Sequence, residues 1–267
     1  MQSNRLKHNA DKTECIWLTT WQRQSPFAAS NLTVGGSIII RTKGTRNLGV
    51  FVDNKLDVRS HVSNICRTCY FRLRQLRTVR RSLQPKILKA LLHPVVSWQL
   101  DYCNSLYVGL LACDIAQLQS VQNAVARLLG GASKYDSVTP VLRDVLHWLP
   151  IKEVINFKIG VLINKARNRL APSYLSETLG PVAVNPALLR HRSANCGDIT
   201  VPRAKNTSYD DRSFAITAPM LWKSFSVALC CISSKNFLFA KDLRLIYLRR
   251  CITSFLHHST DRDFIIQ

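Results

Sequence analysis

Acidic residues are scarce in this sequence, which has 16 Asp and Glu against 37 Lys and Arg and a formal net charge of +21. The deficit is deepest between residues 58 and 100, where nine Lys and Arg occur without a single carboxylate. A surface this basic favours polyanionic partners, either nucleic-acid phosphates or an anionic membrane. The alternative is that the net charge is under no tight selection and does not indicate a partner.

Long apolar runs are also missing. No stretch reaches the roughly 18 uninterrupted apolar residues that a membrane-spanning helix needs, and the polar start "MQSNRLKHNADK" has no signal-peptide apolar region. The nine Cys are an odd number scattered through the chain, a pattern that fits reduced thiols better than a disulfide framework. These absences predict an intracellular protein, nuclear or cytoplasmic, that is not secreted and does not span a membrane.

Motifs of metal and nucleotide chemistry are absent from the sequence as well. It contains no G-x-S-x-G, no G-x-x-x-x-G-K-[ST] and no H-E-x-x-H, so hydrolase and nucleotidase functions lose support. Cys66 and Cys69 have zinc-ligand spacing but no second pair, and helical periodicity predicts that Cys69 is a core thiol. The adjacent Asp210 and Asp211 in "SYDDRSF" fit a surface turn or a helix cap. No metal site is predicted.

What is present is 46% hydrophobic residues, enough to build a core, with two different periodicities. Residues 14–53 carry strand signals, including Gly35-Gly36 as a two-residue turn between two β-rich runs. After Asp57 the period becomes helical and remains so to about Leu179. The predicted fold class is α+β, mostly α, with a small N-terminal antiparallel sheet. Helices are expected over 57–83, 85–106 (kinked or split at Pro94), 114–130 and 151–170. An irregular connection over 181–218 and a final helical pair over 219–256 are expected to follow.

The helix predicted over 57–83 has two distinct faces. Its apolar stripe contains Val62, Ile65, Cys69, Leu73, Leu76 and Val79. Its basic side chains fall on another face and, with two lysines of the next helix, are the candidate nucleic-acid-binding residues: Arg67, Arg74, Arg77, Arg81, Lys86 and Lys89. Trp98, Trp148 and Trp222 have apolar neighbours, so they are expected to pack in the core rather than stack on bases.

Seven short blocks in order make the chain similar to a known family. They are "NRLKHNADKTECIWL", "NLGVFVDNKLDVRSHVSNIC", "QLDYCNSLYVGL", "LQSVQNAVARLL", "TPVLRDVLHWLPI", "APSYLSETL" and "SFAITAPMLWKSF". Together they resemble the C-terminal portion of the reverse transcriptase of jockey-like, LINE-type non-LTR retrotransposons, an RNA-directed DNA polymerase.

The resemblance implies a role for each part of the chain. Residues 1–56 would be a palm remnant, in which Lys12 matches the family's palm lysine and Leu48, Gly49 and Val50 lie in the hairpin that supports the primer end. Residues 57–180 would be a thumb-like helical domain that grips the template–primer duplex through its phosphates. Residues 181–267 would be an irregular connection followed by C-terminal helices.

The sequence also departs from the family's pattern. The fingers, the first metal-binding Asp and the aromatic-x-Asp-Asp hairpin would all lie upstream of Met1, which would then be an internal methionine of a longer protein. Mg²⁺ belongs to the intact family enzyme, so no catalytic residue and no cofactor are assigned here and no polymerase activity is expected of this chain alone. Three hypotheses remain: a truncated reverse transcriptase, a non-enzymatic nucleic-acid-binding module, and a decayed reading frame. The oligomeric state is left open.

Overall fold

The computed structural model describes residues 9, 12–18, 32–34, 36–133, 135–180, 199–203, 210–225, 240 and 243–247. The described part is α+β and mostly α, which confirms the predicted fold class. Two compact units, Met1–Thr68 and Cys69–Gln267, divide inside the first long helix, α1 (Arg59–Val79). Among the described residues, no helix combines the length and apolarity needed to cross a membrane.

In the described residues of the first unit, six short strands form three separate pairs. β2 (Leu32–Val34) and β3 (Ser37–Ile39) form an antiparallel hairpin in which Val34 pairs with Ser37, and Gly36 has a φ of +84°. The hairpin predicted at this double glycine is therefore confirmed, because a two-residue turn of this kind needs positive φ. β5 (Gly44–Asn47) and β6 (Val50–Asp53) form a second antiparallel hairpin.

One strand pair differs from the predicted antiparallel sheet. β1 (Cys15–Ile16) pairs in parallel with β4 (Arg41–Thr42). These two strands come from segments on either side of the β2–β3 hairpin, so their pairing depends on how the chain returns after that hairpin. Alternation of side chains within β1 predicts a strand but carries no information about the direction of its partner.

Large apolar side chains remain exposed on the first unit, and two of them flank a buried neighbour. Ile38 and Ile40 are 67% and 73% exposed, whereas Ile39 between them is 4% exposed. Changing both Ile38 and Ile40 to Thr is expected to raise the soluble fraction of the protein, because Thr keeps β-propensity and removes apolar surface. Its free energy of unfolding should change by no more than about 0.5 kcal/mol per site.

The matched control for this prediction is Ile39→Thr. It places a hydroxyl on the buried face and should destabilise the first unit by about 2 kcal/mol. The measurements are light scattering of the purified variants and urea unfolding. Equal effects of the exposed and buried substitutions would contradict the assignment of the two faces.

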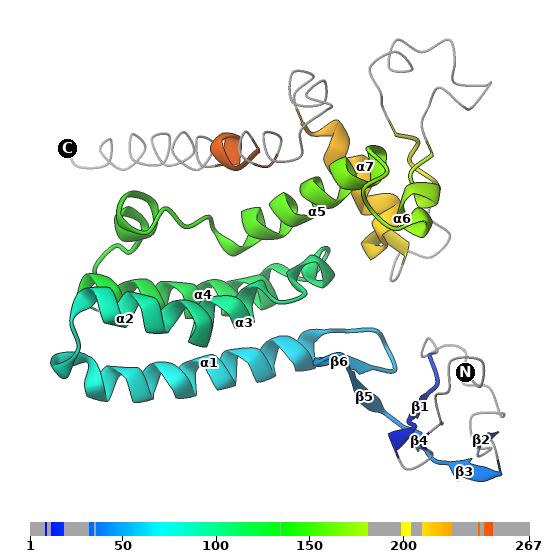
Figure 1. The fold of residues 1–267 in the computed structure, drawn as a ribbon, viewed down its shortest axis with the longest axis horizontal. Helices are drawn as coiled ribbons and strands as arrows, with labels where there is room; N and C mark the ends of the chain where they lie inside the picture. Colours follow the sequence, from blue (N-terminus) through cyan, green and yellow to red (C-terminus); the bar gives the residue numbers. More distant parts are fainter. Residues whose placement is uncertain are drawn as a thin grey trace, which may run out of the picture. The chain divides into compact units, whose positions relative to one another are not determined.

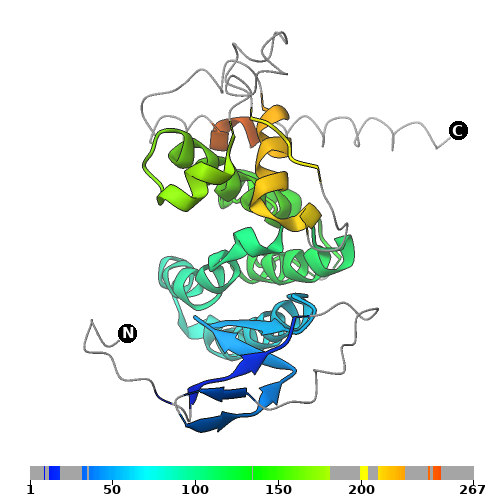
Figure 2. The same cartoon turned by 90° about the vertical axis from the view of Figure 1, so that its right-hand side faces the viewer.

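In the second unit, the helices after α1 lie in two layers (Figures 1 and 2). A 3-10 turn, Arg80–Ser82, leads into α2 (Pro85–Leu92), which continues through a π-helical segment, His93–Ser97, into α3 (Trp98–Asp101). Pro94 lies in the π-helical segment, so the regular α-helix is interrupted at the residue where a kink or split was predicted, although the chain stays helical. A proline lacks the N–H that continues a regular helical ladder, and the wider turn accommodates it. α4 (Ala112–Gly130) lies beside α2 and ends at Gly131, whose φ is +68°.

The second layer is formed by α5 (Ile151–Arg167), α6 (Ser173–Thr178) and α7 (Phe214–Lys223). α5 contacts α4, α6 and α7. Gly160 of α5 permits the side chains of Leu243 and Phe225 to lie close to the helix backbone. A Cβ at this position would lie 2.8 Å from Leu243 Cδ2 and 3.0 Å from Phe225 Cζ. The helices predicted over 57–83, 85–106, 114–130 and 151–170 are all present, whereas α6 was not predicted.

Two predictions about the C-terminal half are wrong. α7 begins at Phe214, inside the stretch expected to be irregular, and Pro219 lies within the helix rather than at its start. Pro219 and Trp222 are buried, so tertiary packing offsets the backbone hydrogen bond that the proline cannot make. Residues 243–247 are helical, as expected for the last helix. Most of 181–209 and of 226–256 lies outside the described residues.

Candidate nucleic-acid interface

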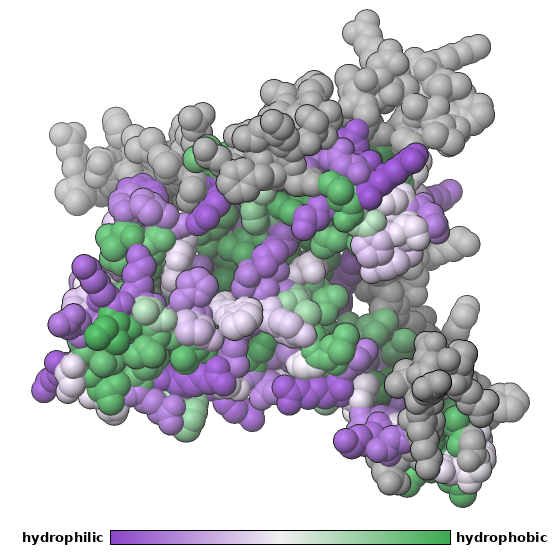
Figure 3. Space-filling view, viewed as in Figure 1, coloured by the Kyte–Doolittle hydropathy of each residue, from purple (hydrophilic) through white to green (hydrophobic). Residues whose placement is uncertain are grey.

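Three of the predicted basic residues lie on the exposed side of α1 and the turn that follows it. Arg74, Arg77 and Arg81 are all exposed, while Cys69 and Leu73 of the same helix are buried. Spacings of three, four and seven residues return to one helix face, and this is why the apolar stripe and the arginines separate. Figure 3 shows hydrophilic residues gathered along α1.

The two predicted lysines extend this basic surface onto α2. Lys86 and Lys89 are exposed, whereas Leu88 and Leu92 of the same helix are buried. α2 starts with Pro85 at its first position, which presets the backbone for a helix, and it follows α1 after only a short turn. We call Arg74, Arg77, Arg81, Lys86 and Lys89 the basic face.

The charges of the basic face are not neutralised within the described structure. None of its five side chains makes an ion pair or a hydrogen bond with a residue that the structure describes. No carboxylate lies in the sequence between Asp57 and Asp101. Like charges held near one another create a positive potential that attracts anions and weakens with salt.

Two other arginines of the same interval do not belong to this face. Arg72 is half-buried, and its guanidinium donates a hydrogen bond to the carbonyl oxygen of Val95 at 2.9 Å. Arg80 is half-buried, and one of its guanidinium nitrogens would lie 3.0 Å from a Cβ at Gly131. Arg72 therefore links α1 to the π-helical segment, and Arg80 lies close to Gly131 at the end of α4. A count of charges along the sequence does not separate these two arginines from the basic face.

Aromatic side chains accompany the arginines on α1. Tyr70 and Phe71 are exposed just before Arg74. Exposed aromatic rings beside arginines provide flat apolar contact area next to positive charge, a combination found at nucleic-acid surfaces. The exposure of these two rings beside the basic face could have been predicted from the sequence, since both residues lie outside the apolar stripe.

Arg67 and the predicted primer-supporting hairpin belong to the first unit. Arg67 is exposed and lines a shallow pocket with Phe51, Arg59, Ser60, Ser63 and Asn64. In the β5–β6 turn, Leu48 and Gly49 have φ values of +46° and +86°, Leu48 is exposed and Val50 is buried. The hairpin is present as predicted, and its role at a primer end stays a prediction.

A histidine of α1 accepts a hydrogen bond from the backbone of this hairpin. The backbone N–H of Phe51 donates to Nδ1 of His61 at 3.4 Å. Burial of the imidazole, followed by the nearby charge of Arg46, lowers the pKa of His61 from its ordinary value. The ring is therefore neutral at pH 7 and can accept the backbone hydrogen bond.

The remaining predicted site residues give no catalytic constellation. Lys12 is exposed just before β1, and its backbone N–H donates to the Asn9 carbonyl at 3.3 Å. Cys66 and Cys69 are buried thiols, as expected of core cysteines, and burial raises the pKa of Cys66 to about 11. Within the described part of the chain, no group of three or more His, Cys, Asp or Glu side chains could hold a metal ion. Asp210 and Asp211 lie in a short 3-10 turn before α7.

The prediction for the three tryptophans is right for Trp222 and wrong for Trp98. Trp222 is 1% exposed, whereas Trp98 on α3 is 67% exposed, and Trp148 lies between these extremes. Apolar neighbours in the sequence do not place Trp98 in the core because the adjoining π-helical segment changes the helical register. Trp148 lines a cavity that sequence reasoning missed.

No family model, curated protein or solved structure matches this chain. The resemblance to a reverse transcriptase therefore depends on the sequence blocks quoted above.

Proposed function

We propose that this chain binds nucleic-acid duplexes through their phosphates, as a thumb-like part related to the reverse transcriptases of non-LTR retrotransposons. The observation that carries the proposal is the basic face: five exposed cations with no ion pair or hydrogen bond to any described residue. Both a reverse transcriptase fragment and a separate binding module would use this activity.

The spacing of the arginines suits a phosphate backbone. Seven residues separate Arg74 from Arg81, which corresponds to roughly 10 Å along a helix. One strand of a duplex carries about three phosphates over that length, because each strand has one charge per ~3.4 Å. Arg74, Arg77 and Arg81 thus offer about one cation for each phosphate. Lys86 and Lys89 add point charges at the neighbouring helix.

This mode of contact positions a duplex without reading its sequence. Arginine and lysine bound to phosphate oxygens fix orientation, whereas sequence is read at base edges in the grooves. The expected ligands are DNA duplexes and RNA–DNA hybrids, with little preference among base sequences.

The test is the salt dependence of duplex binding by the full chain. If all five cations contact phosphates, the log–log slope of affinity against salt should be about −4.5, and affinity should fall roughly 500-fold between 50 and 200 mM salt. Fluorescence anisotropy with two duplexes of unrelated sequence measures both slope and specificity. Binding that ignores salt, or that differs by more than about tenfold between the sequences, would contradict the proposal.

A further inference from the structure

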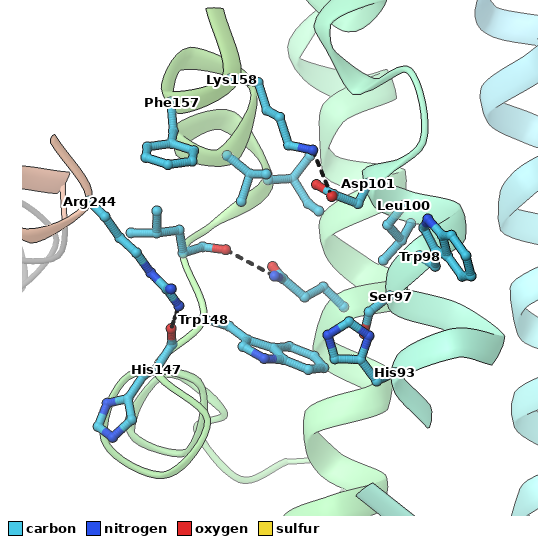
Figure 4. Close-up of a pocket in the computed structure, with 14 residues that line it drawn as sticks. His93, Ser97, Trp98, Leu100, Asp101, His147, Trp148, Phe157, Lys158 and Arg244 are labelled. Carbon is cyan, nitrogen blue, oxygen red and sulfur yellow. Dashed lines mark hydrogen bonds and ion pairs between the residues drawn. The ribbon is translucent and has the colours of Figure 1, made fainter. Parts of the chain in front are cut away.

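A cavity of about 330 Å³ lies in the second unit, between the two helical layers. Its lining comes from the π-helical segment and α3 on one side, from α5 and the residues before it on the other, and from the helical residues 243–247. Figure 4 shows the side chains that surround it. None of the residues of the basic face lines this cavity.

Aromatic and aliphatic side chains form most of the wall. Trp148 and Phe157 supply two aromatic rings, and Leu149, Ile151 and Val154 lie among them. Trp98 turns its ring away from the centre, in agreement with its exposure (Figure 4). A wall of this kind stabilises a flat ring by stacking and by removing apolar surface from water.

Three polar side chains of the wall already have partners. Lys158 Nζ lies 2.7 Å from the Asp101 carboxylate, and the Gln122 amide donates to the Leu149 carbonyl oxygen at 2.9 Å. Asp101 is the one carboxylate among the lining residues, so its pairing leaves no free negative charge in the wall. A cationic ligand therefore has no counter-charge here.

The polar groups still open to a ligand suit an anion with hydrogen-bonding atoms. Ser97 Oγ is buried and has no hydrogen-bond partner among the described residues. The imidazoles of His93 and His147 and the guanidinium of Arg244 also line the cavity. Arg244 makes one long hydrogen bond, 3.4 Å to the His147 carbonyl oxygen, and is exposed. Its other donors can therefore reach a phosphate.

We infer that this cavity receives one unpaired nucleotide of a nucleic-acid strand, with the base against Trp148 and Phe157 and its phosphate at Arg244. The inference rests on the proposed function, because it adds a second contact to a duplex held on the basic face. The cavity lies at the small end of the range for ligand pockets, so it fits one flat group and its phosphate rather than a helix or a strand segment. A free mononucleotide has the same chemistry and is the alternative source.

The experiment compares three ligands for the full chain: a blunt duplex, the same duplex with a short single-stranded overhang, and thymidine monophosphate as competitor. The overhang should raise affinity roughly tenfold, because each base stacked on an aromatic ring contributes measurably to binding. Phe157→Leu keeps an apolar side chain and should remove most of this gain, and Arg244→Gln should reduce it. Both variants should leave the affinity for the blunt duplex unchanged, as should the exposed control Tyr174→Ala on α6.

A second measurement does not depend on any variant that could fail to fold. With 5-iododeoxyuridine in the overhang, ultraviolet crosslinking and mass spectrometry should locate the base at Trp148 or Phe157. Equal affinity for blunt and overhanging duplexes, with the salt slope retained, would overturn this inference and leave the proposed function standing. Loss of salt-dependent duplex binding would overturn the proposed function. Removal of the overhang preference by low concentrations of thymidine monophosphate would assign the cavity to a free nucleotide instead.

Discussion

Replacing Arg74, Arg77 and Arg81 together by Glu is expected to weaken duplex binding at least about 1,000-fold. A charge-assisted hydrogen bond contributes about 1.5 kcal/mol or more, so loss of three such contacts accounts for a factor of this size, and repulsion of phosphates adds to it. The magnitude of the log–log salt slope should fall by about 2.7, which corresponds to three phosphates on B-DNA. Because all three side chains are exposed and make no ion pair with a described residue, the fold should be retained.

The control must separate local contacts from overall charge. Lys152, Lys165 and Lys223 are exposed lysines of α5 and α7, and changing them to Glu lowers the net charge by the same amount. This variant should keep most of the affinity, apart from a modest loss of long-range attraction. Anisotropy titrations over the same salt range decide the point. Equal losses of duplex affinity in both triple variants would mean that binding depends on net charge and that the basic face is not the interface.

Replacing Trp222 by Ala is expected to cost about 3–5 kcal/mol of stability, the range for removing a large aromatic side chain from a core. The indole is 1% exposed. Its ring meets Phe225 edge to face at 5.8 Å between centroids, and the Arg167 guanidinium carbon lies 4.5 Å above it. The variant loses both the edge-to-face contact and the cation–π contact. A domain at the lower end of the usual range of about 5–15 kcal/mol would then be close to unfolding at 37 °C.

Met220→Ala is the matched control for Trp222→Ala. Met220 lies on the same helix, α7, and is 59% exposed, so its truncation should change the free energy of unfolding by no more than about 0.5 kcal/mol. Urea unfolding followed by circular dichroism gives both values. If Trp222→Ala were as mild as Met220→Ala, α7 would not be packed on α5 as described.

Local patterns account for most of the helices. The apolar stripe over 57–83 predicts α1 and the burial of Val62, Cys69 and Leu73, because helical spacing depends only on residues a few positions apart. Val79 is the exception, since it is exposed where α1 ends. The start of α7 could not be predicted in the same way. Pro219 is a local signal against a helix interior, and burial of the neighbouring residues outweighs it.

The candidate sites differ in how far the sequence reveals them. Arg74, Arg77, Arg81, Lys86 and Lys89 come from one stretch of two consecutive helices, so their common exposure follows from helical periodicity. The cavity around Trp148 and Phe157 combines side chains from residue 93 to residue 244. Nothing in the spacing of those residues predicts that they meet, and Trp148 alone looks like an ordinary core residue.

By itself, the amino-acid sequence determined the mostly helical fold class, the β2–β3 hairpin and a basic surface without carboxylates, because each follows from the type and short-range spacing of residues. Only the tertiary structure decided that Arg72 bonds to Val95 while the basic face stays exposed, that β1 pairs in parallel with β4, and that a cavity opens between the two helical layers. Those outcomes depend on contacts between segments far apart in the chain. Such contacts are set by packing and chain direction, which no local pattern records.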